Sequence, residues 1–235
     1  MYRVRIKICG VTNIVDARMA EREGADAIGF VFWPQSPRAL PVARVGEITR
    51  VLSPLTTKIG VFCDAGVAEV ERTVRRSGLT GAQICGTPPG NGWRAIARRV
   101  RLIRVIPVDP KSPPKDPPWP FCYDYLFDTG TEELPGGTGE PFDWSLLPEN
   151  KDAGWDRIYI SGGLTSENVG ELIKKYRPYA VDVSRTVEGE SGRKDPRLVR
   201  EFIAAVREAE YEVSESTATA EGNDNGPNET DGNAG

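Results

Sequence analysis

The sequence predicts an α/β fold, a single-domain (β/α)8 TIM barrel, on the strength of three observations. Eight short runs rich in β-branched residues occur before residue 185. Amphipathic stretches separate most of these runs, a pattern typical of repeated βα units around a parallel sheet. No GxGxxG motif follows the first run. An open doubly wound sheet is the alternative fold, and the missing glycine motif disfavours it.

The predicted strands and helices alternate along the chain, with one interruption. The strand candidates lie at residues 3–9, 26–32, 58–63, 82–85, 101–108, 123–128, 157–161 and 180–184. The helix candidates lie at residues 13–23, 41–52, 66–77, 92–100, 166–176 and 195–210. Gly24 is a typical helix end, and Ser166 and Asp195 are typical helix starts. Residues 107–120 hold seven prolines, so we expect a Pro-rich loop to replace the fifth helix.

Charge and composition divide the chain into two parts. Residues 211–235 carry six acidic residues and no basic residue, and they are rich in Gly, Asn, Ser and Thr. We therefore predict a barrel domain at residues 1–210 and a disordered acidic tail at residues 211–235. The domain carries all 30 basic residues and 28 of the 34 acidic ones, so it presents no strong field for binding nucleic acid.

Several function classes are excluded or disfavoured. The chain has no histidine, which excludes Ser-His-Asp catalysis and histidine-ligated metals. Its four cysteines, Cys9, Cys63, Cys85 and Cys122, form no CxxC motif, and we expect them to be reduced thiols in a cytoplasmic protein that binds no metal. No apolar run approaches the roughly 20 residues that span a bilayer, so we expect no membrane partner.

Alternation along the strands predicts which side chains point into the barrel. In the first strand, Val4, Ile6 and Ile8 should face the helices. The inward set is then Arg5, Lys7 and Cys9 in the first strand, Asp124 and Asp128 in the sixth, and Asp182 and Ser184 in the eighth. In the fourth strand, Gln83 and Cys85 share one face. Buried charges must be paired, so we expect Arg5 and Asp124 to join a structural ion-pair network. Lys7, Cys9 and Asp128 lie near the carboxyl ends of strands, where barrel active sites are found.

Short motifs in a consistent order carry a family resemblance that covers residues 5–206. They lie at residues 7–10, 24–38, 60–62, 127–129, 136–139, 142–144, 161–164, 167–169, 181–184, 187–188 and 192–196. Together they resemble the phosphoribosylanthranilate isomerase family, barrel enzymes of tryptophan biosynthesis. Two positions depart from the family pattern. Cys85 replaces the usual histidine of the fourth strand, and Ser184-Arg185 follows the eighth.

The resemblance implies an Amadori rearrangement of N-(5-phosphoribosyl)anthranilate, with Cys9 as general base, Asp128 as general acid and no cofactor. Backbone amides at Gly162 and Gly163, with Ser184 and Arg185, suit the phosphate site of barrels after the seventh and eighth strands. A guanidinium binds carboxylates as a fork, so Arg38 fits the anthranilate carboxylate. Lys7 and Gln83 complete the expected substrate-binding set. The glycine-rich residues 136–139 are predicted to form a mobile loop beside Asp128 that acts as a lid of the site.

Two rival functions stay open on the sequence. One is the related aminoaldose isomerase of histidine biosynthesis, although that resemblance would favour a carboxylate in place of Cys9. The other is a phosphate-ligand-binding paralogue without activity, because Cys85 changes the fourth strand. In each case the partner is a phosphorylated small molecule, and the chain is a monomer or a homodimer.

Overall fold

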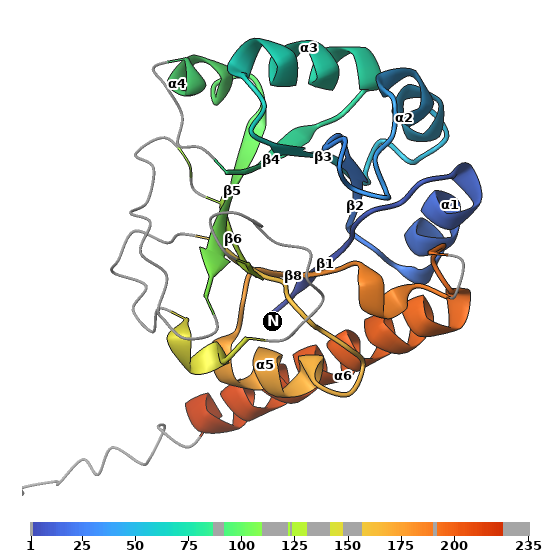
Figure 1. Cartoon of the computed structure of the whole chain (residues 1–235). Helices are drawn as coiled ribbons and strands as arrows, with labels where there is room; N and C mark the ends of the chain where they lie inside the picture. Colours follow the sequence, from blue (N-terminus) through green and yellow to red (C-terminus); the bar gives the residue numbers. More distant parts are fainter. Residues whose placement is uncertain are drawn as a thin grey trace, which may run out of the picture.

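Eight parallel strands close into a barrel, with each strand next to its neighbour in sequence (Figure 1). This computed structural model describes residues 2–86, 92–109, 122, 124–130, 142–147, 157–189 and 192–222. The fold prediction is confirmed. The strands are β1 (Arg5–Ile8), β2 (Ala27–Val31), β3 (Thr57–Cys63), β4 (Gly81–Cys85), β5 (Arg101–Val108), β6 (Asp124–Thr129), β7 (Arg157–Ile160) and β8 (Ala180–Val183).

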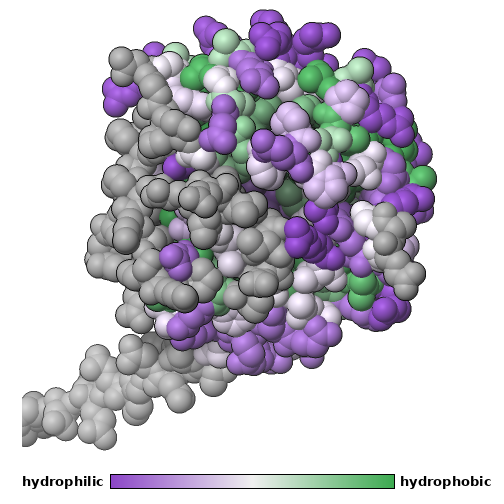
Figure 2. All heavy atoms as spheres, in the orientation of Figure 1, coloured by the Kyte–Doolittle hydropathy of each residue, from purple (hydrophilic) through white to green (hydrophobic). Residues whose placement is uncertain are grey.

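Helices surround the barrel, and Figure 2 shows many hydrophilic side chains on the outer surface of this ring. The α-helices are α1 (Ile14–Glu23), α2 (Val42–Thr49), α3 (Val67–Ser77), α4 (Trp93–Ile96), α5 (Val169–Tyr176) and α6 (Pro196–Gly222). Two 3-10 helices, η1 (Trp144–Leu146) and η3 (Arg185–Val187), lie in loops after β6 and β8. The parts of the chain that the structure describes contain no helix long and apolar enough to cross a membrane.

Local signals set the ends of the helices. Gly24 ends α1 at a φ of 107°, a left-handed conformation that glycine adopts without strain. Asp195 precedes α6, and its carboxylate accepts hydrogen bonds from the backbone N–H groups of Arg197 (2.7 Å) and Leu198 (3.2 Å). Helix α5 begins at Val169, later than predicted, because residues 166–168 form a turn in which Asn168 accepts from the Thr165 N–H.

Only the start of the Pro-rich segment lies among the described residues. Pro107 and Val108 belong to β5 and pair in register with Asp128 and Thr129 of β6. A proline fits here because, among the described residues, the pairing of β5 with β4 ends at Arg104, so Pro107 has a paired strand on one side only, as on a sheet edge. Residues 110–120, where the loop was predicted in place of a fifth helix, lie outside the described residues, as does the predicted loop at residues 136–139.

Two hydrophobic cores follow from the alternation along the strands. Ile6, Ile8 and Phe127 belong to the outer core, between the barrel and helices such as α6, which contributes Phe202. The inner core fills the barrel and consists of Cys9, Ile59, Val61, Cys85, Ile103, Val105 and Leu126. The predicted division of the first strand is therefore confirmed.

Charged side chains close the end of the barrel where the strands begin. The buried Asp124 carboxylate accepts from Arg101 Nε at 2.6 Å and from Arg157 Nε at 2.7 Å. Arg5 lies with its guanidinium 4.8 Å from the centre of the Tyr179 ring, a cation–π contact. An ion-pair network around Asp124 is present, with arginines from β5 and β7. The predicted membership of Arg5 in it is wrong, because its guanidinium packs on the Tyr179 ring instead.

Helix α6 runs past the boundary expected at residue 210 and continues to Gly222. The reason is packing that composition did not indicate. Val213 is buried in the outer core, and Lys174 of α5 pairs with Glu212 at 2.7 Å. An apolar contact of this kind stabilises a helix whose sequence is otherwise polar. The rest of the predicted tail, residues 223–235, lies outside the described residues.

Replacing Val213 by alanine tests whether this extension belongs to the folded domain. Val213 is 4% exposed, whereas Val15 on α1 is 65% exposed. We expect Val213→Ala to lower the free energy of unfolding by about 1–2 kcal/mol through lost apolar burial. The matched control, Val15→Ala, should change it by less than about 0.5 kcal/mol. Urea denaturation measures both values, and equal effects would contradict the packing described for residues 211–216.

Candidate active site

A cavity of about 320 Å³ opens at the carboxyl ends of the strands. It contains every predicted site residue except Lys7. The predicted residues that line it are Cys9, Arg38, Gln83, Asp128, Gly162, Gly163, Ser184 and Arg185. Barrel active sites lie at this end because the loops that follow the strands converge there.

Lys7 lies beneath the cavity and is not among its lining residues, and its part in substrate binding stays a prediction. Its ammonium nitrogen is 2.6 Å from a carboxylate oxygen of Asp182, and both side chains are almost fully buried. The two residues are partners in the register of β1 and β8, where the barrel closes. Burial alone would lower the pKa of Lys7, but Asp182 and Cys9 raise it above its usual value. Lys7 therefore stays charged directly under the site.

Cys9 follows β1 and contributes its thiol to the cavity. Its N–H donates to the Val183 carbonyl at 2.8 Å, and its carbonyl accepts from the Ser184 hydroxyl at 3.1 Å. A side chain at Gly29 of β2 would come within 2.8 Å of the sulfur, so Gly29 makes room for it. Burial raises the pKa of Cys9, while the Lys7 cation lowers it. The net direction is upward, so the resting thiol is mainly protonated near neutral pH.

Asp128 lies at the end of β6, on a strand that is not adjacent to β1 in the closed barrel. Its side chain is partly exposed and lines the same cavity as the Cys9 thiol. The strand is held in place by Ser161, whose N–H donates to the Phe127 carbonyl at 2.8 Å. A thiol and a carboxyl group thus reach one cavity from separate strands.

The loops after β7 and β8 form one edge of the cavity. Gly162 and Gly163 have φ values of 87° and 61°, and a side chain at Gly162 would collide with the Thr129 hydroxyl. Asn168 secures this turn by donating to the Gly163 carbonyl at 2.9 Å. The Thr186 hydroxyl of the second loop donates to the Leu164 carbonyl of the first. Backbone without side chains, joined to a hydroxyl-bearing turn, suits the binding of a phosphate group.

Arg38 reaches the cavity from the loop after β2. Its guanidinium pairs with Glu188 through two hydrogen bonds, one from Nε at 2.7 Å and one from Nη2. The Arg38 side chain passes over Gly10, which has a φ of 71°. A side chain at Gly10 would collide with that of Arg38. Sequence reasoning assigned Glu188 no role, because its partner lies 150 positions away. Its place in the resembling motif at residues 187–188 was the available signal.

Two buried acceptor atoms line the cavity with no hydrogen-bond partner among the described residues. They are Oε1 of Gln83 and Oδ1 of Asp182. An unpaired buried acceptor costs about 1–3 kcal/mol, so both atoms are suited to receive hydroxyl groups from a ligand. Asp182 is missing from the predicted site, although alternation placed its side chain inside the barrel.

Cys85 has a sulfur neighbour on the adjacent strand. Its Sγ lies 2.9 Å from Sγ of Cys63, and the two residues are partners in the β3–β4 register. Both thiols line the cavity and are free. The Cys63 contact and burial hold the pKa of Cys85 well above its usual value. The described parts of the chain hold no cluster of three Cys, Asp or Glu side chains arranged to bind a metal.

The closed barrel and the contents of its cavity define a TIM-barrel enzyme with a site suited to a phosphorylated small molecule. Comparison with known families gives a specific result: the model of the N-(5'-phosphoribosyl)anthranilate (PRA) isomerase family matches residues 6–205. The chain therefore belongs to this family, and the resemblance drawn from its motifs is confirmed.

Individual relatives agree with the family match. The chain is 41% identical to the N-(5'-phosphoribosyl)anthranilate isomerase of Pseudomonas aeruginosa over 208 residues, which cover 88% of this chain and 97% of the relative. A crystal structure of phosphoribosyl anthranilate isomerase from Thermus thermophilus has 31% identity and a TM-score of 0.75, over 87% of this chain and 99% of that one. A further structure, also 31% identical with a TM-score of 0.72 over 87% and 99%, is an isomerase in complex with reduced 1-(o-carboxyphenylamino)-1-deoxyribulose 5-phosphate.

Replacing Lys7 by methionine tests the ion pair beneath the site. The change leaves the Asp182 carboxylate buried without its cation, which should lower the free energy of unfolding by about 3–5 kcal/mol at pH 7. Arg3→Met is the control, because it breaks the exposed Arg3–Asp26 pair and should cost at most about 1 kcal/mol. Denaturant titration measures the free energy of unfolding of both variants. Similar losses would show that the buried Lys7–Asp182 pair stabilises the fold no more than the exposed pair does.

Proposed function

We propose that this chain isomerises N-(5-phosphoribosyl)anthranilate to 1-(2-carboxyphenylamino)-1-deoxyribulose 5-phosphate, an Amadori rearrangement in tryptophan biosynthesis. The observation that carries the proposal is the pair of Cys9 and Asp128 in one cavity with anion-binding groups at its edge. Family membership supports the same reaction, as does the relative whose structure holds the reduced product-like compound.

The reaction needs an acid first and then a base. Asp128, as general acid, donates a proton to the ring oxygen of the ribose, and the C1–O bond breaks to leave a protonated Schiff base. Cys9, as thiolate, removes the proton from C2, and the electrons of that C–H bond flow to the nitrogen to form an enolamine. The enolamine then gains a proton at C1 and loses the proton of its C2 hydroxyl, which gives the aminoketose. Each proton-transfer group of this kind contributes about 10²–10⁴-fold to rate.

The remaining cavity groups hold the two ends of the substrate. Backbone N–H groups at Gly162 and Gly163, with Ser184 and Arg185, receive the phosphate. Arg38 binds the anthranilate carboxylate through its charge and donors. The unpartnered oxygens of Gln83 and Asp182 accept hydrogen bonds from the sugar hydroxyls. The four cysteines are free thiols, which fits a reducing compartment, and we infer a cytoplasmic location.

Removing either catalytic group tests the assignment. Cys9→Ala and Asp128→Asn should each lower kcat at least about 100-fold while leaving the fold intact by circular dichroism. Cys122→Ala is a matched control, because Cys122 is a buried thiol of the outer core and should retain nearly full turnover. The assay follows the loss of anthranilate-type fluorescence on addition of enzyme to freshly made substrate.

The same assay separates the rival functions. Turnover of the histidine-pathway aminoaldose in preference to this substrate would favour the related isomerase. Tight binding of a product analogue by an inactive wild-type chain would favour a non-catalytic binder. Full activity in Cys9→Ala or in Asp128→Asn would remove that residue from the mechanism.

The direction of the Cys9 pKa predicts how the rate depends on pH. Because burial raises this pKa above the ordinary thiol value of about 8.5, the thiolate fraction of the free enzyme grows as the pH rises. In the Asp128→Asn variant, which has no titrating general acid to oppose this gain, we expect kcat/KM to increase about tenfold per unit between pH 6.5 and 8. Cys122→Ala should leave this slope unchanged. A profile that is flat across this range would contradict a thiolate base in the free enzyme.

A further inference from the structure

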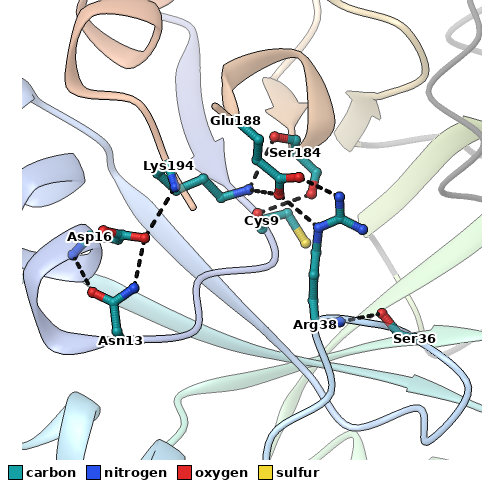
Figure 3. Close-up of polar contacts among 8 residues, drawn as sticks. All are labelled: Cys9, Asn13, Asp16, Ser36, Arg38, Ser184, Glu188 and Lys194. Carbon is teal, nitrogen blue, oxygen red and sulfur yellow. Dashed lines mark hydrogen bonds and ion pairs between the residues drawn. The ribbon is translucent and has the colours of Figure 1, made fainter. Parts of the chain in front are cut away.

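Glu188 lies between two cations at the Cys9 end of the cavity (Figure 3). One of its carboxylate oxygens accepts from Arg38 Nε at 2.7 Å and also from Lys194 Nζ at 2.6 Å. The other oxygen pairs with Arg38 Nη2. Its side chain is only 7% exposed, so water screens these contacts little.

Lys194 is held at this place from two sides. Its ammonium, almost fully buried, donates to the Ser184 carbonyl at 3.0 Å as well as to Glu188. Its backbone N–H donates at 3.1 Å to Asp16, which is itself bonded to Asn13 at the start of α1. Figure 3 shows this chain of contacts running from Asn13 through Lys194 to Glu188 and Arg38. A buried ammonium needs such a partner, because its desolvation costs several kcal/mol.

We propose that Glu188 is a positioning residue for the isomerase reaction, which holds the Arg38 guanidinium at the carboxylate end of the substrate and the Lys194 ammonium beside Cys9. The part that concerns Arg38 rests on the proposed function. Neither Glu188 nor Lys194 needs to touch the reacting atoms in this role.

Electrostatics support the geometry. Lys194 lowers the pKa of Cys9, and Cys9 in turn raises the pKa of Lys194. Burial lowers the pKa of Lys194, and Glu188 opposes that shift, so Glu188 keeps the ammonium charged. The other charged or titratable groups that act on Cys9 or respond to it are Lys7, Asp182, Arg38 and Cys85. With one anion between two cations, the Arg38–Glu188–Lys194 cluster presents a net positive charge to the thiol and to an anionic substrate.

A purely structural tie is the competing interpretation, because Glu188 also links the loop after β2 to the loop after β8. Such a tie would affect stability without a specific dependence on Arg38. A double-mutant cycle distinguishes the two roles, because residues that act through one another are not additive.

The first experiment measures KM and kcat for Glu188→Gln, Arg38→Gln and the double variant, each at its pH optimum. We expect Glu188→Gln to raise KM at least about tenfold with kcat within about threefold. In the Arg38→Gln background the same change should raise KM less than about twofold. The control is Glu210→Gln, which disrupts the partly buried Glu210–Arg207 pair near the start of β1 and should leave KM unchanged. Equal effects of Glu188→Gln in both backgrounds would overturn the positioning role.

A conservative variant guards against misfolding. Glu188→Asp keeps the charge but shortens the reach by one methylene, so its KM should lie between those of wild type and Glu188→Gln. If Glu188→Gln does not fold, the Asp variant replaces it in the cycle. Two results together would exclude the positioning role of Glu188. They are a KM of Glu188→Asp equal to that of wild type, and additive effects of the Glu188 and Arg38 changes in the cycle.

The second experiment needs no turnover. The rate of Cys9 alkylation by iodoacetamide is followed against pH by peptide mass spectrometry, because the thiolate is the reactive form. Lys194→Gln should move the midpoint up by at least about 0.5 pH unit, since a cation beside the thiol is lost. The neighbouring exposed Arg193, which pairs with Asp16, is the control, and Arg193→Gln should leave the midpoint in place.

The outcomes of the two experiments separate the two proposals. A wild-type chain without turnover would overturn the proposed function, while the alkylation result would still test Lys194 beside Cys9. An unchanged Cys9 midpoint in Lys194→Gln would overturn the role of Lys194, whatever the turnover of the wild type.

Discussion

The buried ion pair between Lys7 and Asp182 is the interaction on which the site depends. It joins β1 to β8, the two strands that close the barrel. Because side chains alternate along a strand, Cys9 and Ser184 follow the paired residues on the same inward side. The hydrogen bond from the Ser184 hydroxyl to the Cys9 carbonyl joins the same two segments again, just beyond the ends of β1 and β8. The closure of the fold and the placement of the proposed base are thus one structural feature.

The balance of buried charges around Cys9 then controls the chemistry of its thiol. Two buried lysines lie near the thiol, and each has its own carboxylate, Asp182 for Lys7 and Glu188 for Lys194. Each pairing keeps an ammonium charged in an apolar setting, where a lone cation would lose its proton. The cations favour the thiolate while burial opposes it. The enzyme thereby holds a weakly acidic thiol that a bound, charged substrate can still influence.

Patterns within single strands were sufficient to predict the barrel, its two cores and the inward position of Cys9 and Asp128, because strand periodicity is local. Contacts between distant segments were not predictable in this way. Glu188 meets Arg38 across 150 positions, and Cys85 meets Cys63 only because the register of β3 and β4 pairs them. The extension of α6 was missed for a related reason. Its polar composition suggested disorder, and a buried contact at Val213 outweighs that composition.

The path of α6 also has a practical meaning for the molecule. The helix starts beside the cavity loops at Asp195 and reaches the opposite end of the barrel, where Glu210 accepts a hydrogen bond from the Val4 N–H just before β1. Figure 1 shows its last turns leaving the ring of helices at the periphery. A group attached at Gly222, where the described part of this helix ends, would therefore lie on the side of the barrel away from the cavity.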